Sequence, residues 1–110
     1  SERAEEQSSA IRERIGAARA RQQERFRSDK KTTCNARMSS RAIKQHCRLT
    51  TDSQELIRVA MSELSLSARA YDRILKVART IADLEGVAAI APEHVGEAIQ
   101  YRTFDRTLWV

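Results

Sequence analysis

Apolar side chains recur every three or four residues along most of the chain, which is the spacing of one face of an α-helix. The first such segment runs from about residue 4 to 27 and has a thin apolar stripe, made of Ile11, Ile15, Ala18, Gln22 and Phe26. Its other faces are very polar, so we expect this helix to dock on something rather than to form the centre of a core. Residues 28–37 are polar and aperiodic, which predicts a loop, and a short helix follows from about Ser39 to Cys47.

Two of the helices in the second half have recognisable start signals. Asp52 and Glu55 have the spacing of a capping box, which predicts a helix start there. The face of that helix extends to about residue 64 and is marked by Leu56, Val59, Ala60 and Leu64. Pro92 at a first helical position begins the last helix, whose apolar residues are Val95, Ala98 and Ile99.

The helix between these two has the widest apolar face. Ser67 is a good N-cap for it, and Gly86 stands where a glycine would end it. Its apolar residues are Ala70, Tyr71, Ile74, Leu75, Val77, Ala78, Ile81, Ala82 and Leu84. We therefore expect this helix to be the most buried. The predicted fold class is all-α, a small helical bundle with a long, projecting N-terminal helix.

Composition agrees with this prediction and narrows the class of protein. The 110 residues suit one small domain, and three Gly and one Pro leave few turns for short strands. No uncharged run approaches the roughly 18 residues that a membrane span requires. Residues 1–6 lack the apolar stretch of a signal peptide. We expect a cytoplasmic protein with no membrane partner.

The net charge of +5 is concentrated in the first fifty residues. Lys and Arg minus Asp and Glu give 9 − 6 = +3 over residues 1–31, 4 − 0 = +4 over 32–50 and 7 − 9 = −2 over 51–110. This distribution favours either a phosphate-bearing partner or a solvated helix face. The candidate phosphate or DNA contacts are Arg12, Arg14, Arg19, Arg37, Arg41, Lys44 and Arg48.

The chain lacks a catalytic site of its own. Its glycines stand alone, so no glycine-rich loop can wrap phosphates, and no nucleophile motif is present. His94 is expected to be a surface or boundary residue near a helix start. Cys47 follows His46, but no second pair of ligands completes a tetrahedral metal site. We expect neither a catalytic residue nor a metal site, and a small, partly buried apolar role for Cys47.

Arg69 has an unusual position, two residues after the predicted N-cap Ser67. The positive end of a helix dipole slightly disfavours a cation there. A bound phosphate would reverse this balance, because free N–H groups and a guanidinium would converge on one anion. A solvent-exposed arginine without a ligand is the alternative.

The run from Leu66 to Leu84, LSARAYDRILKVARTIADL, resembles the C-terminal domain of magnesium-chelatase-like AAA+ ATPases, in particular the ComM (YifB-like) group. Segments within residues 8–19 and 97–106 agree as well, so the resemblance covers nearly the whole chain. Asp72 stands where many relatives carry His, and residues 28–37 have no match.

This resemblance implies that a nucleotide-binding α/β core precedes the present helical lid in a longer parent ATPase. Residues 1–31 would then be a basic linker helix, and 32–110 the lid of an excised C-terminal fragment. The resemblance also implies that Arg69 is the sensor-2 arginine, reaching the γ-phosphate of ATP in its own or a neighbouring subunit. ATP and Mg²⁺ would be cofactors of the parent, and we expect the fragment alone to bind neither. The expected partners are the parent's own core and the neighbouring subunits of a homo-oligomeric ring.

The motor's substrate stays open between several alternatives. For ComM-like members the resemblance implies DNA translocation and branch migration during natural transformation, and for true magnesium chelatases insertion of Mg²⁺ into protoporphyrin. The ending Tyr101-Arg102 and the run Arg69-Ala-Tyr favour the ComM-like branch. A stand-alone helix-turn-helix over residues 52–64 and the helix from Ser67 is a second hypothesis, although that helix is apolar for a DNA groove. A helical adaptor without a ligand is a third.

Overall fold

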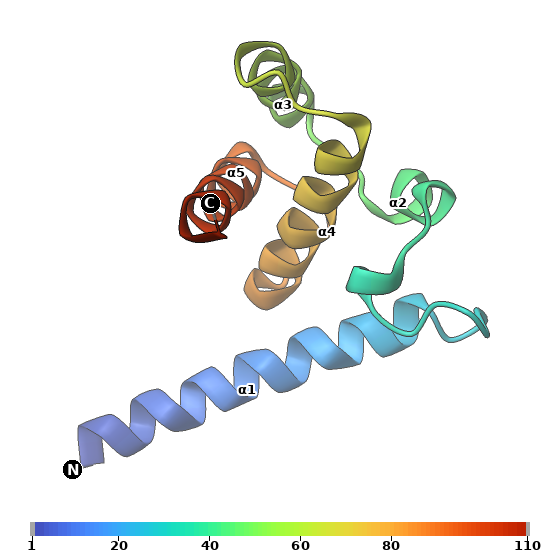
Figure 1. Ribbon diagram of the computed structural model, residues 1–110. Helices are drawn as coiled ribbons and strands as arrows, with labels where there is room; N and C mark the ends of the chain where they lie inside the picture. Colours follow the sequence, from blue (N-terminus) through green and yellow to red (C-terminus); the bar gives the residue numbers. More distant parts are fainter. Residues whose placement is uncertain (1, 110) are drawn as a thin grey trace.

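The computed structural model describes the backbone of residues 2–109 and the side chains of residues 2–102, and this part of the chain is helical without strands (Figure 1). The elements in chain order are α1 (Glu2–Arg25), the 3₁₀ turn η1 (Asn35–Arg37), α2 (Ser40–His46), α3 (Thr51–Glu63), α4 (Ala68–Glu85) and α5 (Pro92–Trp109). The predicted all-α class is confirmed. The loop predicted over 28–37 is shorter than expected, since its last three residues form η1.

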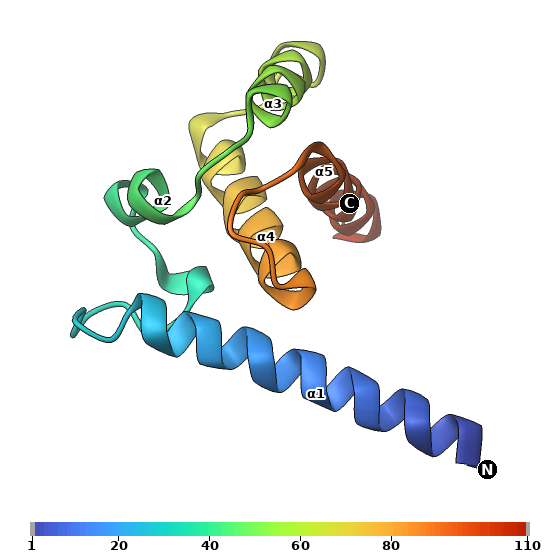
Figure 2. The ribbon, with the colours of Figure 1, turned by 180° about the vertical axis from the view of Figure 1, so that it is seen from behind.

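The apolar face of α4 makes it the central helix, as predicted. Its buried residues include Ile74, Leu75, Ala78 and Ala82, and it packs against α1, α2, α5 and η1 (Figures 1 and 2). The Ser67 hydroxyl accepts the N–H of Ala70 at 3.2 Å and caps the helix. Gly86 ends it with a φ of 80°, a left-handed conformation that glycine adopts without a Cβ penalty. A helix enclosed in this way is not available to lie in a DNA groove, which argues against the helix-turn-helix alternative.

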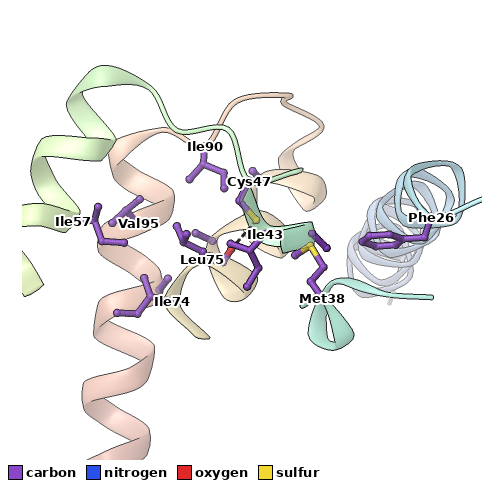
Figure 3. Packing of buried hydrophobic residues seen from close by; sticks show 13 residues of the cluster. Phe26, Met38, Ile43, Cys47, Ile57, Ile74, Leu75, Ile90 and Val95 are labelled. Atoms are coloured by element: carbon purple, nitrogen blue, oxygen red, sulfur yellow. Dashed lines mark hydrogen bonds between the residues drawn. The ribbon is translucent and has the colours of Figure 1, made fainter. Parts of the chain in front are cut away.

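The core is mostly aliphatic and joins the helices around α4 (Figure 3). Ile43 of α2, Ile57 of α3 and Val95 of α5 converge on Leu75 and Ile74. The segments before α3 and before α5 also meet through a single parallel bridge between Leu49 and Ile90. Ile90 N–H donates to the carbonyl of Arg48 at 2.9 Å, and Thr50 N–H to that of Ile90 at 3.2 Å. This bridge fixes where α3 and α5 begin.

The capping box predicted at Asp52 and Glu55 is wrong. Thr50 is the N-cap of α3, and its hydroxyl accepts the N–H of Ser53 at 3.2 Å. The bridge to Ile90 holds Thr50 in an extended conformation, and the helix begins at Thr51, two residues before the start that Asp52 as N-cap would give. Asp52 therefore lies exposed in the first turn. Glu55 pairs instead with Arg58 at 2.6 Å.

The buried face of α3 is also rotated from the predicted one. Ser53, Ile57 and Ala60 are buried, whereas three of the four predicted residues are at least one-third exposed: Leu56, Val59 and Leu64. The reason is the hydroxyl of Ser53, which donates to the carbonyl of Ile90 at 2.7 Å and turns this polar position inward. Only Ala60 of the predicted face is buried.

The two terminal helices pack over only part of their lengths. Helix α1 is about 36 Å long from its 24 residues. Ala18 and Phe26, the residue after its end, are buried, but Ile11 and Ile15 are 46% and 40% exposed. The predicted docking stripe therefore docks only in its C-terminal half. Pro92 begins α5 as predicted, with Val95 and Ala98 buried. The side chains of Asp105 and Arg106, which contribute to the resemblance, lie outside the described part. Among the described residues, no helix has the length and apolarity needed to cross a membrane.

Candidate functional site

Arg69 lies on the exposed N-terminal end of α4. It is the second residue of that helix, and its side chain is exposed. A tight turn precedes it, in which Ser65 adopts a φ of 49° and Leu66 N–H donates to the carbonyl of Met61 at 3.1 Å. This turn separates α3 from α4 and leaves the end of α4 at the surface.

The first turn of α4 retains unused hydrogen-bond donors. The Ser67 hydroxyl accepts only the third N–H, that of Ala70. Within the described part of the chain, neither the N–H groups of Ala68 and Arg69 nor the Arg69 guanidinium has a hydrogen-bond partner or ion pair. Two free N–H groups and the positive helix end therefore lie on the same turn as one exposed arginine, a combination that can bind an anion.

The other predicted basic residues are exposed too, and they are spread over several elements. Their locations are α1 for Arg12, Arg14 and Arg19, η1 for Arg37, α2 for Arg41 and Lys44, and the residues after α2 for Arg48. Helix α1 crosses the opposite end of α4, where Arg21 donates to the carbonyl of Asp83 at 3.1 Å. Asp83 follows Arg69 by fourteen residues, about 21 Å along the helix. The structure thus separates Arg69 from the basic face of α1 (Figure 1).

A buried carboxylate at the far end of α4 orients α1. Arg25 donates two hydrogen bonds of 2.8 and 2.6 Å to the Asp83 carboxylate, and Asn35 donates to the same carboxylate at 2.8 Å. Burial alone would raise the pKa of Asp83, whose side chain is inaccessible. The hydrogen bonds from Arg25 and Asn35 and the charges of Arg25 and Arg79 outweigh burial and hold this pKa below its ordinary value. Asp83 is therefore ionised and ties α1 and η1 to α4.

Arg79, one turn before Asp83, fixes the loop between α4 and α5. Its guanidinium donates to the carbonyls of Ala88 and Val87 at 2.7 and 2.8 Å, and its Nε lies 3.2 Å from an Asp83 oxygen. The side chain is only 2% exposed. Sequence reasoning missed this buried pair. The signal was an Arg and an Asp four residues apart in the helix with the widest apolar face, where side chains at this spacing share one face.

His94 is buried, which corrects the expected surface or boundary position. It is 1% exposed, and its Nδ1 accepts the N–H of Ala91 at 2.9 Å. The proton of the neutral ring therefore resides on Nε2, which donates to Glu85. The side chain closes the start of α5 onto the end of α4.

The carboxylates of Glu85 and Glu93 and the His94 ring form a compact group, with ligand atoms within 4.8 Å of one another. A metal would need the lone pair of Nε2, but this nitrogen carries the proton as long as Nδ1 accepts from Ala91. The geometry favours a hydrogen bond between two helix ends over a metal site.

The cysteines lie in different surroundings. Cys47 is buried, more fully than the partly buried position predicted, and burial raises the pKa of its thiol to about 11. It is therefore a thiol at neutral pH, and a thiol is a poor nucleophile. Cys34 precedes η1 and is half-buried.

The chain is similar to known proteins over nearly its whole length. The family described as magnesium chelatase, subunit ChlI C-terminal, matches residues 5–102. The uncharacterised protein YifB of Salmonella typhimurium is 42% identical over 103 residues, which cover 94% of this chain and 19% of that protein. The competence protein ComM of Haemophilus influenzae is 40% identical over the same shares. The chain spans about a fifth of the length of these relatives. It belongs to the magnesium chelatase ChlI C-terminal family and is similar to the proteins named ComM and YifB.

Proposed function

We propose that this domain is the lid of a ring-forming ATPase and that Arg69 is its sensor-2 arginine, which contacts the γ-phosphate of ATP. The nucleotide-binding core would lie elsewhere in the parent protein, so ATP hydrolysis and Mg²⁺ binding belong to the whole protein. The observation that carries the proposal is an exposed arginine, Arg69, in the same first turn of α4 as two free N–H groups.

The physical argument is one of charge. A cation at a helix N-terminus is unfavourable alone, but becomes favourable when an anion lies between it and the free N–H groups. Arg69 would neutralise charge on the transferred phosphoryl group. The release of that phosphate would break the contact with Arg69 and so allow the lid to move. Its location at the surface suits contact with the core of its own subunit or of a neighbour.

DNA is the substrate that we propose for the motor, which would translocate on it and promote branch migration. Two observations support this: the relative named competence protein, and a segment of four cations and no acid over residues 32–50. The alternative is a magnesium chelatase subunit, supported by the description of the matched family.

The test is ATP turnover by the full-length parent, wild type and Arg69→Ala, with and without branched DNA. A charge-assisted hydrogen bond contributes about 1.5–3 kcal/mol, so the variant should lose roughly 10- to 150-fold in turnover if the bond forms in the transition state. The isolated domain should not hydrolyse ATP.

Arg73→Ala is the matched control, because Arg73 is an exposed arginine one turn further along α4. Its turnover should stay at the wild-type rate. Normal turnover of Arg69→Ala would exclude Arg69 from the site. If DNA does not change the turnover, the proposal of an ATPase lid stands but DNA is rejected as the motor's substrate. Insertion of Mg²⁺ into protoporphyrin would then be measured.

A further inference from the structure

A groove of about 730 Å³ opens on the side of the domain where α2 and α3 diverge over the first half of α4. Its floor is apolar and comes from all three helices and the segment that joins α2 to α3. The lining apolar residues are Ile43, Cys47, Leu49, Ile57, Met61, Tyr71 and Leu75. The deepest of these belong to the core, whereas Leu49, Met61 and Tyr71 are only partly buried. The groove therefore offers open apolar surface at the edge of a rigid core.

The rim of this groove is basic. Lys44 and Arg48 are exposed, and neither forms an ion pair with any other described residue. Arg58 stands opposite and pairs with Glu55, but both side chains are more than 60% exposed, so this pair is weak and can exchange partners. One acid lines the groove, Asp72, and it accepts the Ser40 hydroxyl at 2.7 Å. Three cations against one acid leave an excess of positive charge.

We propose that this groove binds an acidic protein segment that inserts one or two large apolar side chains between α2 and α3. The apolar floor would take these side chains, and Lys44, Arg48 and Arg58 would meet the acidic residues beside them. A nucleic acid matches the rim but not the floor, because its backbone presents phosphates and no aliphatic side chain. The groove is too small for a permanent interface, so binding is weak and transient. Arg69 itself does not line this groove, although Tyr71 and Asp72 on the same part of α4 do, and the proposal does not rest on the role given to Arg69.

The experiment measures binding of short labelled peptides to the 110-residue chain by fluorescence anisotropy. The main probe is an amphipathic peptide with two leucines one helical turn apart, flanked by glutamates. Two further peptides replace either the glutamates by lysines or the leucines by alanines. Only the first should bind in the micromolar range, and more weakly as the salt concentration rises.

Charge variants then locate the site. The double variant Lys44→Glu and Arg48→Glu should weaken binding of the acidic peptide at least about tenfold, because like charges would face each other. A matched double variant, Arg12→Glu and Arg37→Glu, makes the same charge change at exposed positions that do not line the groove and should bind as the wild type does. Asp72→Asn removes the one acid of the rim and should tighten binding about two- to fivefold. Circular dichroism of each variant verifies that the helices are intact.

The proposal is overturned if the acidic peptide does not bind, if its alanine counterpart binds equally well, or if both double variants weaken it alike. A short DNA duplex is tested in parallel. Binding of the duplex, lost on reversal of Lys44 and Arg48, without binding of the peptide would assign the surface to nucleic acid instead.

Discussion

Asp83 is the residue on which the attachment of α1 depends. It is fully buried and surrounded by Arg25, Arg79 and Asn35. We expect Asp83→Asn to lower the free energy of unfolding by about 3–5 kcal/mol, because the buried guanidinium of Arg79 would lose its counter-charge. Urea unfolding followed by circular dichroism measures this. The exposed Asp52→Asn is the control and should change stability by no more than about 0.5 kcal/mol.

The same residue sets a pH dependence. The pKa of Asp83 lies below its ordinary value in the folded protein, so its stabilising contribution is complete above the pKa of the unfolded chain. It is lost as the pH falls through the lower, folded value. The wild type should therefore lose more stability than Asp83→Asn on acidification below about pH 4. Equal acid sensitivity of the two proteins would contradict the ionised, paired state of Asp83.

At the scale of the element, the start of α3 distinguishes two capping assignments. Thr50 supplies the capping hydroxyl, whereas Asp52 is exposed in the first turn. Thr50→Ala should therefore lower the free energy of unfolding by about 1 kcal/mol and Asp52→Ala by only a few tenths. Thermal unfolding of both variants measures the difference. A larger loss of stability in Asp52→Ala than in Thr50→Ala would instead support Asp52 as the N-cap of a capping box.

Local signals determined which elements the sequence could predict. The N-cap Ser67, the terminating Gly86 and the first-turn Pro92 act within a few residues, and all three were located correctly. The cap of α3 was not, because the bridge to Ile90, forty residues away, decides it. The burial of His94 likewise depends on Glu85 at the end of another helix.

The candidate site shows the same division. The location of Arg69 in the first turn of α4 follows from the cap before it, so the sequence was sufficient. The groove between α2 and α3 was not predicted, because it arises from how two helices diverge over a third. The spacing of apolar residues along the chain does not predict the angle between α2 and α3. Arg79 and Asp83 were readable in principle, as an ion pair inside an apolar helix.

At the scale of the whole molecule, α1 is attached to the other helices only near its C-terminal end. The contacts with the bundle are made by Ala18, Arg25 and the following residue Phe26. From there α1 continues past the bundle toward its N-terminus (Figure 2). Polar contacts with Asp83 provide much of this attachment, and such contacts fix direction more than apolar packing does. The ion pair with Asp83 therefore sets the direction of α1 relative to α4.

Truncation tests this division of α1 into a free and an attached part. A chain that begins at Gly16 loses Ile11 and the other exposed residues of the first turns but keeps Ala18, Arg25 and Phe26. Its free energy of unfolding should fall by less than about 1 kcal/mol, because exposed residues contribute little. A chain that begins at Arg27 also loses the buried Phe26 and leaves Asp83 without Arg25, so a fall of about 3–5 kcal/mol is expected. Urea midpoints of the two chains separate these outcomes. Equal losses would mean that the first turns of α1 stabilise the bundle and that the helix is attached along its whole length.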